Sequence, residues 1–562
     1  MVSEDSRTRQ GAITDTVLCF LIQDSRRSHV AWAEMPGARD RFAGRATWFS
    51  LHVRPAGKRI VRRPLSARLI LTLLAAMMAC TSSPEPAAIK GASPNPPPPP
   101  PAFCRADSQT ISENDDPQDA LDAAGHGAEL CFEPGIYRLR QALQPLSGQT
   151  LDFRPGAVLN GSEIVDNWTR QGSHWSSTGH LHSDLDNVPG LPDQTQMCQD
   201  SPAACIFDDV FLDGRPLEQV QTLSSLDEPD EVFFDGPAGT INIATDPTDR
   251  QVEATVAGFA IQSAADDVTI RGATIEMFAY TGINTAANRW WIEDSDILYV
   301  HYQAIGIYGG TGHVIRNNHV HHNGVIGMTA AGVNGFTIQG NEFDHNNYLH
   351  AGPKAGGYHE GAVKILQSHD VVFRDNWSHD NVGDGLWFDT DNYGILIESN
   401  VLEDNSRNGL QYEASFDATV RYNTIRGNGT DLGSQGAGIL NSTSKNVEYY
   451  GNRIEGNRIR SIVILWSDRG QSATLGERQS ANLSFHDNVI VLDDNPQSWV
   501  GVYWDQDPRV FTSNNRFQGN TYFVPKNGER EGARYWRWDG SDLTWAEWQA
   551  RGFDTTGSLV SA

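Results

Sequence analysis

A cluster of carboxylates lies next to two large aromatic side chains in GDGLWFDTDN, residues 383–392. Asp384, Asp389 and Asp391 fall within eight residues and flank Trp387 and Phe388. Carboxylates at this density repel one another unless a turn, a metal ion or a substrate compensates. Two neighbouring carboxyls with split pKa values can supply one acid and one base or nucleophile. An exposed indole ring can stack on a sugar. The element that carries this segment decides among these roles.

A repeat of paired asparagines indicates what that element is. The second member of each pair follows five positions after the first, and the pairs recur at a nearly constant interval where no insertion intervenes. Apolar residues mostly stand three positions before and two positions after each first member. This pattern predicts a parallel β-helix, whose coils stack about 4.8 Å apart, whereas a leucine-rich repeat requires an L-x-x-L-x-L pattern that is absent. The pairs are Asn318/Asn323, Asn341/Asn346, Asn376/Asn381, Asn400/Asn405, Asn423/Asn428, Asn452/Asn457 and Asn515/Asn520.

Aligning the coils by their glycines places the opening segment on an outer face. GLWFDTDN then lies over GLQYEASFD, residues 409–417, and AVKILQ, residues 362–367, precedes it. Strand alternation puts Phe388 inside the coil and Trp387 outside. Asp391 shares the outer side if its strand continues. The outer face is predicted to carry Lys364, Trp387, Asp389, Gln411 and Glu413.

Asp389 and Glu413 on neighbouring rungs are the candidate catalytic pair. Carboxyl separations of about 5–7 Å are within reach of such rungs, and they suit cleavage of a glycosidic bond. We expect Trp387 to be exposed and to stack on a sugar, with Gln411 and Asp391 also contacting the substrate. Taken singly, carboxylates such as Asp384 and Asp391 more often cap a turn. If desolvated, Lys364 could act as a neutral base.

Histidines supply weaker candidates. His359 lies in an insertion, HAGPKAGGYHEG, that lengthens the coil between Asn341 and Asn376, and it could reach over the outer face. A second insertion, around SDRGQSATLGERQS, lengthens the coil between Asn452 and Asn488. Insertions in solenoids project as loops on one face, often the binding face. Solvated turns are the expected location of His319, His321, His322 and His379.

Residues 1–80 are predicted to be a leader. RRPLSARLILTLLAAMMAC, residues 62–80, has basic residues before an apolar run that ends at Cys80, as in bacterial lipoproteins. We expect lipidation of Cys80 and export, either to a lipid anchor on the cell envelope or to the medium. The segment upstream of this run, residues 1–61, suggests a mis-called start codon. A proline-rich linker, residues 81–101, follows.

The remaining chain is expected to fold in three parts. Residues 102–256 hold a cap helix, the first coils and a β-rich excursion, residues 257–525 the regular coils, and residues 526–562 a C-terminal cap. Cysteines in an exported chain predict disulfides, here Cys198–Cys205 and Cys104–Cys131. Residues 80–562 carry a formal net charge of −34, which argues against nucleic acid and anionic membranes as partners. We expect a monomer that acts on a polysaccharide.

From about Ala102 onward the chain resembles the right-handed parallel β-helix superfamily of secreted bacterial carbohydrate-active proteins, the pectate-lyase-like group. The resemblance rests on DPQDALDAA, LCFEPGIYRL, SGQTLDFRPGAVLNGS and the asparagine-paired coils. It implies an all-β, right-handed solenoid with a short N-terminal cap helix. It selects no single activity, because such folds host lyases, hydrolases, epimerases and noncatalytic adhesins. The DPHD-type motif of alginate epimerases is missing.

The leading interpretation is an exported enzyme that hydrolyses glycosidic bonds with Asp389 and Glu413 and requires no cofactor. One alternative is a polysaccharide lyase acting on a uronate polymer. In it, Lys364 or His359 abstracts a proton, and Ca²⁺ held by Asp389 and Asp391 neutralises the substrate carboxylate. The other alternative is a noncatalytic glycan-binding surface protein.

Overall fold

The computed structural model describes residues 18–24, 27–33, 104–105, 108–180, 201–352, 360–430, 436–493, 498–503, 507–525 and 533–561, the first two ranges by backbone alone. The chain divides into two units, Met1–Pro99 and Pro100–Ala562. In the first unit β1 (Leu18–Asp24) pairs antiparallel with β2 (Arg27–Ala33). Cys80 and the linker lie outside the described residues, so the leader stays a prediction. No helix in the described ranges is long and apolar enough to cross a membrane.

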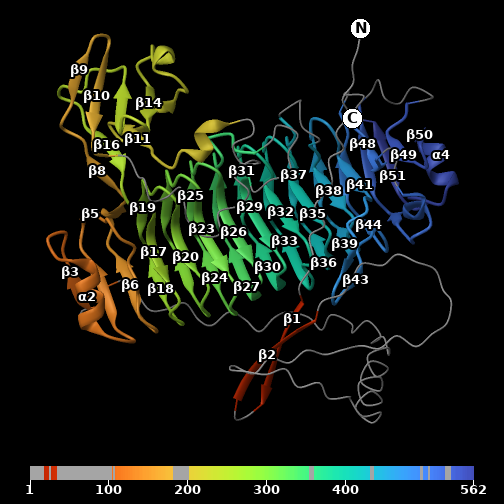
Figure 1. The fold of residues 1–562 in the computed structure, drawn as a ribbon. Helices are drawn as coiled ribbons and strands as arrows, with labels where there is room; N and C mark the ends of the chain where they lie inside the picture. Colours follow the sequence, from red (N-terminus) through yellow and green to blue (C-terminus); the bar gives the residue numbers. More distant parts are fainter. Residues whose placement is uncertain are drawn as a thin grey trace, which may run out of the picture. The chain divides into compact units, whose positions relative to one another are not determined.

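Three long, mainly parallel sheets build the second unit, as predicted for a parallel β-helix (Figure 1). Each regular coil contributes one strand to each sheet, and neighbouring coils pair in register, as Ile292 does with Ile315. Sheet 1 consists of β17 (Phe259–Ser263), β20 (Thr281–Thr285), β23 (Gln303–Tyr308), β26 (Ile326–Ala331), β29 (Gly361–Leu366), β32 (Leu386–Asp389), β35 (Leu410–Glu413), β38 (Ile439–Ser442), β41 (Ile462–Leu465), β46 (Val500–Val502), β49 (Trp536–Trp538) and β50 (Ser541–Leu543).

The other two sheets run alongside sheet 1 from the first coils to the last. Sheet 2 consists of β3 (Gln109–Ile111), β4 (Glu129–Phe132), β6 (Thr150–Phe153), β18 (Thr269–Arg271), β21 (Trp291–Glu293), β24 (Val314–Arg316), β27 (Asn334–Gln339), β30 (His369–Arg374), β33 (Ile395–Glu398), β36 (Phe416–Arg421), β39 (Lys445–Tyr450), β44 (Ser484–His486) and β47 (Arg516–Gln518). Sheet 3 consists of β5 (Gly135–Arg138), β7 (Ala157–Asn160), β19 (Thr274–Glu276), β22 (Asp296–Leu298), β25 (His319–His321), β28 (Glu342–Asp344), β31 (Trp377–His379), β34 (Val401–Glu403), β37 (Thr424–Arg426), β40 (Arg453–Glu455), β45 (Val489–Val491), β48 (Thr521–Val524) and β51 (Ser558–Ser561).

The repeated asparagines form buried ladders that join the coils. Asn400 Oδ1 accepts hydrogen bonds from the backbone N–H and the side-chain amide of Asn376. The Asn400 amide donates to the Phe373 carbonyl and to Asn423 Oδ1. Each side chain therefore satisfies buried polar groups at the turn and fixes the stacking of the next coil. The predicted alignment of Asn376, Asn400 and Asn423 is confirmed.

The predicted pair Asn515/Asn520 was wrong in its position within the coil. Asn520 accepts hydrogen bonds from Asn488 and so continues the first ladder. Asn515 accepts from the Leu483 N–H in another turn, before β47. Two asparagines five positions apart can lie on either side of any three-residue strand. The spacing alone therefore does not distinguish a strand of sheet 2 from a strand of sheet 3.

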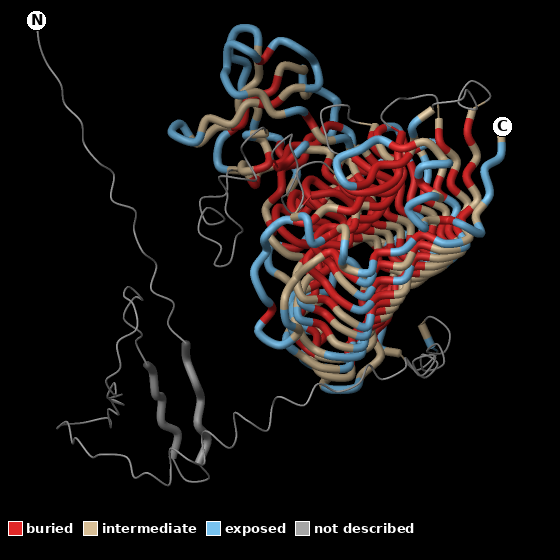
Figure 2. Tube along the Cα trace, turned by 90° about the vertical axis from the view of Figure 1, so that its right-hand side faces the viewer, coloured by how far each residue is buried: buried red, intermediate tan, exposed pale blue. Residues whose placement is uncertain are grey.

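Apolar side chains fill the interior of the coils, and buried segments recur at the same level along the stack (Figure 2). Phe388 and Tyr412 both point inward from neighbouring strands of sheet 1 and are fully buried, as the alternation predicted. Outer positions of the same strands are left for polar side chains. The fold thus separates core residues from candidate site residues within a single four-residue strand.

Two short helices lie near the two ends of the coils. Helix α2 (Pro117–Ala124) begins after Asp116, whose side chain accepts a hydrogen bond from the Asp119 N–H, as expected for an N-cap. Helix α4 (Trp545–Ala550) begins after Thr544 with a capping box. Its buried Trp548 packs against Phe517 of β47, with ring centroids 5.0 Å apart. The predicted cap helix and C-terminal cap are both present.

Two small sheets form the β-rich excursion predicted before the regular coils. Its own apolar core includes Val210, Val232 and Ile241. The excursion consists of β8 (Ser162–Ile164), β9 (Thr169–Gln171), β10 (His174–Thr178), η2 (Pro202–Cys205), β11 (Val210–Leu212), β12 (Arg215–Pro216), β13 (Glu218–Gln219), η3 (Leu223–Ser225), β14 (Glu231–Asp235), β15 (Thr240–Ile243) and β16 (Val252–Thr255). Later insertions add β42 (Gln471–Ser472), β43 (Gly476–Glu477) and η4 (Pro508–Phe511).

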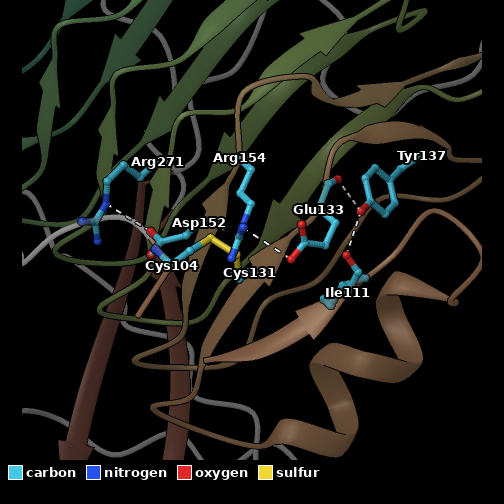
Figure 3. The surroundings of a disulfide bond; sticks show 8 residues. All are labelled: Cys104, Ile111, Cys131, Glu133, Tyr137, Asp152, Arg154 and Arg271. Carbon is cyan, nitrogen blue, oxygen red and sulfur yellow. Dashed lines mark hydrogen bonds and ion pairs between the residues drawn. A yellow bond between two sulfur atoms is a disulfide. The ribbon is translucent and has the colours of Figure 1, made fainter. Parts of the chain in front are cut away.

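A disulfide ties the start of the second unit to the first coils (Figure 3). It joins Cys104 to Cys131 of β4, the pair that proximity in the sequence favours. The Cys104 N–H donates to Asp152 Oδ2 at 2.8 Å, and Arg271 lies 3.1 Å from the other carboxylate oxygen of Asp152. Cys205 is also disulfide-bonded. Its predicted partner Cys198 lies outside the described residues, so that pairing stays a prediction.

Candidate active site

The outer face of β29, β32 and β35 carries the predicted set of side chains in the predicted register. Lys364 pairs with Trp387, and Trp387 pairs with Gln411 on the next strand. Asp389 pairs with Glu413 one row further along the same strands. The two carboxylates therefore lie on adjacent rungs, about 4.8 Å apart at the backbone.

The predicted solvent exposure of this face was wrong. The hairpin of β42 and β43 belongs to the second insertion, and arginines flanking its strands contact the acidic residues of the face. Because the side chains also pack against one another, little of their surface stays open. The exposed fractions are 3% for Trp387, 4% for Lys364, 5% for Gln411 and 8% each for Asp389 and Glu413.

Lys364 binds two of its neighbours at once. Its Nζ lies 3.1 Å from Asp389 Oδ2 and 3.3 Å from the centre of the Trp387 ring. The Lys364 amine is therefore already engaged by a carboxylate and by an aromatic face. This arrangement does not suit a neutral base. It also covers the indole face, so the predicted stacking of a sugar on Trp387 would require Lys364 to move.

Glu413 lies in a different environment from Asp389. Burial raises the pKa of Glu413, and the nearby Asp389 carboxylate raises it further, while Arg469, Gln411 and Lys364 lower it in part. The Gln411 amide donates to Glu413 Oε2 at 2.7 Å. Thr390 donates to Asp389 Oδ1 at 2.8 Å. The site thus holds one carboxyl inclined to keep its proton beside one that is ion-paired with Lys364.

A buried chain of hydrogen bonds supports Gln411 from the start of the strands. The Asn408 amide donates to Gln411 Oε1 at 2.9 Å and to Asp384 Oδ1 at 2.7 Å. Asp384 also accepts from the Asn408 backbone N–H. Asp384 therefore binds a backbone N–H of the next coil, whereas the sequence predicted a cap on its own turn. It also anchors the Asn408 amide that orients Gln411 and, through Gln411, Glu413.

Three arginines complete the site. Arg469 lies 3.6 Å from Asp389 Oδ1 and 3.2 Å from Glu413 Oε1, so one guanidinium spans both candidate catalytic carboxylates. Arg407 is partly buried and lies 2.8 Å from Glu360 and 3.5 Å from Asp384. The third, Arg478, donates two hydrogen bonds to Asp391, at 2.9 and 2.8 Å.

Asp391 departs from its predicted place on the strand, and His359 lies beyond the described residues. Asp391 adopts a left-handed backbone conformation, with φ of 60°, and leaves the strand. Arg478 engages both of its carboxylate oxygens, so neither substrate contact nor a shared Ca²⁺ with Asp389 follows from its placement. His359 lies outside the described residues, and its predicted catalytic role stays a prediction.

The arginines were missed by the sequence reasoning. Arg469 and Arg478 come from a later coil than Asp389 and Asp391, the aspartates that they contact. Only the length of the second insertion indicated that something projects over a face. Arg407 lies three positions before Leu410, the first residue of β35, in SRNGLQYE. An alignment of charges before each strand could have singled it out.

Comparisons with known proteins identify the architecture. A family model described as "Right handed beta helix region" matches residues 281–459. The complex structure of XylC with xylose is similar with a TM-score of 0.58 and 16% identity, covering 79% of this chain and 82% of that chain. The A-module of Azotobacter vinelandii mannuronan C-5 epimerase AlgE6 has a TM-score of 0.45 and 14% identity, covering 79% and 93%. No curated protein sequence matches the chain.

Of these two structures, the XylC structure is similar enough to bear on the fold. It extends beyond the region matched by the family model and agrees with the three-sheet stack of coils. The chain is therefore a right-handed parallel β-helix protein.

Proposed function

We propose that the protein is a glycoside hydrolase whose catalytic carboxylates are Asp389 and Glu413. The observation that carries the proposal is the unequal setting of two carboxyls on adjacent rungs of a largely buried site. Glu413 has a raised pKa because it is buried beside another carboxylate. Asp389 is ion-paired with Lys364, whose Nζ lies 3.1 Å from Oδ2. A protonated acid beside an ionised carboxylate is what glycosidic cleavage requires.

The roles follow from these settings. Glu413 donates its proton to the glycosidic oxygen, so that the bond from this oxygen to the anomeric carbon breaks. Asp389 attacks the anomeric carbon and forms a glycosyl ester. This direct attack needs carboxyls about 5–5.5 Å apart, a separation that side chains on paired residues of adjacent strands can adopt. Glu413 then deprotonates the water that hydrolyses the ester. The configuration at the anomeric carbon is retained, which proton NMR of the first product would show.

The charges at the site favour a neutral sugar. Among the described residues, the acidic side chains of Asp389, Glu413, Asp384 and Glu360 face the basic side chains of Lys364, Arg407 and Arg469. No cation there is left in excess for a substrate carboxylate. The XylC structure contains xylose, so xylosides are a suitable first member of a panel of neutral aryl glycosides.

The decisive experiment compares Asp389→Asn and Glu413→Gln with wild type on that panel. A catalytic acid or base contributes about 10²–10⁴-fold in rate. Asp389→Asn should lose this activity on every substrate. Glu413→Gln should lose less on aryl glycosides with acidic leaving groups, because these depart without protonation. Glu398→Gln, which changes an acid paired with Arg421 on sheet 2, is the matched control and should keep full activity. Full activity in both site variants would overturn the proposal.

The lyase alternative predicts different results. A lyase with Lys364 as its base requires an uncharged amine, whereas Lys364 is held between Asp389 and Trp387. It also predicts unsaturated products that absorb ultraviolet light, and loss of activity in a chelator if Ca²⁺ takes part. Hydrolysis should give neither. Glycan binding without any turnover would instead favour the noncatalytic alternative.

A further inference from the structure

Five histidines gather on the outer face of sheet 3, away from the strands of the candidate active site. His319 and His321 belong to β25, and their rings stack with centroids 3.9 Å apart. These two histidines and His379 were predicted to lie in solvated turns, but they occupy strands β25 and β31, and His379 is buried. Asp296 of β22 pairs with His319 in register. The remaining histidines are His322, His345 and His379.

Three side-chain atoms of this cluster converge. Asp296 Oδ1 lies 3.5 Å from His319 Nδ1 and 2.9 Å from His321 Nε2. All three ligand atoms lie within 4.8 Å of one another. Ligands bound at about 2.0–2.1 Å around a tetrahedral zinc ion are separated by about 3.3 Å. The observed spacings bracket that value, so small side-chain rotations would close the set around one ion.

The second nitrogen of each ring already has a partner. His319 Nε2 lies 2.6 Å from Asp344 Oδ1, and His321 Nδ1 lies 2.8 Å from His322 Nδ1. Histidines that bind metals nearly always bind a carboxylate or another acceptor through their other nitrogen, which fixes the tautomer and the ring orientation. An ordinary surface ion pair needs no such second partner. The arrangement therefore matches a metal site in its outer contacts as well as in its ligands.

We propose that Asp296, His319 and His321 bind a divalent transition-metal ion of the zinc class. Two imidazoles and one carboxylate suit zinc, nickel or iron(II) better than the hard cations Ca²⁺ and Mg²⁺, which take oxygen ligands. Asp296 and His319 are half-exposed, so an ion can enter from solvent and keep open positions for water. Because the ligands come from β22 and β25, the ion would join two successive coils.

The test uses untagged full-length protein loaded with Zn²⁺ and dialysed, with metal content measured by mass spectrometry. Wild type should retain one equivalent at this site, and the double variant His319→Gln/His321→Gln should lose it. Calorimetry should show at least a 100-fold weaker affinity in the double variant and a loss of 10–100-fold in Asp344→Asn, which removes only an outer contact. Co²⁺ in place of zinc should give a visible absorption band that the double variant lacks.

His486→Gln is the matched control. His486 also contacts two acids, at 2.8 and 3.1 Å, but neither contact involves a second histidine. The affinity of the His486→Gln variant for Zn²⁺ should equal that of wild type. Asp296→Asn keeps both imidazoles and should fold normally, so it separates a lost ligand from a lost fold. Equal zinc retention by wild type, the double variant and Asp296→Asn would overturn the proposal, as would no retention by wild type.

Discussion

Replacement of Lys364 by methionine tests whether the candidate active site is enclosed. The Lys364 side chain is buried, with Nζ 3.1 Å from Asp389 and 3.3 Å from the centre of the Trp387 ring. Methionine has a similar length and no charge. In the variant, Asp389 would keep the Thr390 hydroxyl at 2.8 Å and the half-exposed Arg469 at 3.6 Å as its partners.

The expected loss follows from these contacts. Removing one partner of a buried ion pair costs about 3–5 kcal/mol, because the remaining charge stays desolvated. The lost contact with the indole face adds up to about 2 kcal/mol, part of which the methionine sulfur restores. We expect the free energy of unfolding to fall by about 3–5 kcal/mol. The double variant Lys364→Met/Asp389→Asn should recover much of this, because it buries no unpaired charge.

Urea unfolding, followed by tryptophan fluorescence and circular dichroism at pH 7, provides the measurement. The coupling between the two substitutions comes from the double-mutant cycle. Arg289→Met, which breaks an exposed ion pair with Asp267, is the control and should cost no more than about 1 kcal/mol. If Lys364→Met lowers the free energy of unfolding no more than this control does, the Lys364–Asp389 pair is solvated and the site is not enclosed.

The further predictions concern the asparagine ladders, the titration of Glu413, Arg469 and the disulfide. Asn400→Ala should lower the free energy of unfolding, measured by urea unfolding, by about 2–4 kcal/mol, because buried groups on both neighbouring coils lose their partners. A loss below about 1 kcal/mol would contradict the stabilising role of the ladder. Turnover should fall as pH rises through the raised pKa of Glu413, because the acid loses its proton, and Glu413→Gln should remove this limb of the pH–rate profile. Stability should also fall with pH between the ordinary glutamate pKa and this raised value, because there the folded state binds more protons than the unfolded state. Arg469→Ala should move the basic limb of the pH–rate profile to higher pH, since Arg469 lowers the pKa of Glu413. If the limb stays at the same pH, a group other than Glu413 titrates there. Cys104→Ser should lower the free energy of unfolding, measured by urea unfolding without reductant, by about 3 kcal/mol, because the disulfide joins residues with a sequence separation of 27. An unchanged free energy of unfolding would show that the disulfide does not stabilise the fold.

The sequence by itself determined the coil and the register of the candidate active site. A solenoid repeats one local unit, so the spacing of asparagines and inward apolar residues specifies which positions stack. That is why Trp387 could be placed over Gln411, and Asp389 over Glu413, from the glycine alignment alone. Strand alternation then separated Phe388 in the core from its neighbours outside.

Only the tertiary structure decided what covers that face and which groups are paired there. Arg469 and Arg478 reach the site from an insertion in a later coil, and insertions carry no repeat from which their path could be predicted. Lys364 in turn contacts both Asp389 and the ring of Trp387 on the neighbouring strand, and Trp387 is buried. The repeat determines the coil because the stacking contacts join equivalent positions of successive coils. The electrostatics of the site depend also on Arg469 and Arg478, which come from an insertion and have no equivalent position in the other coils.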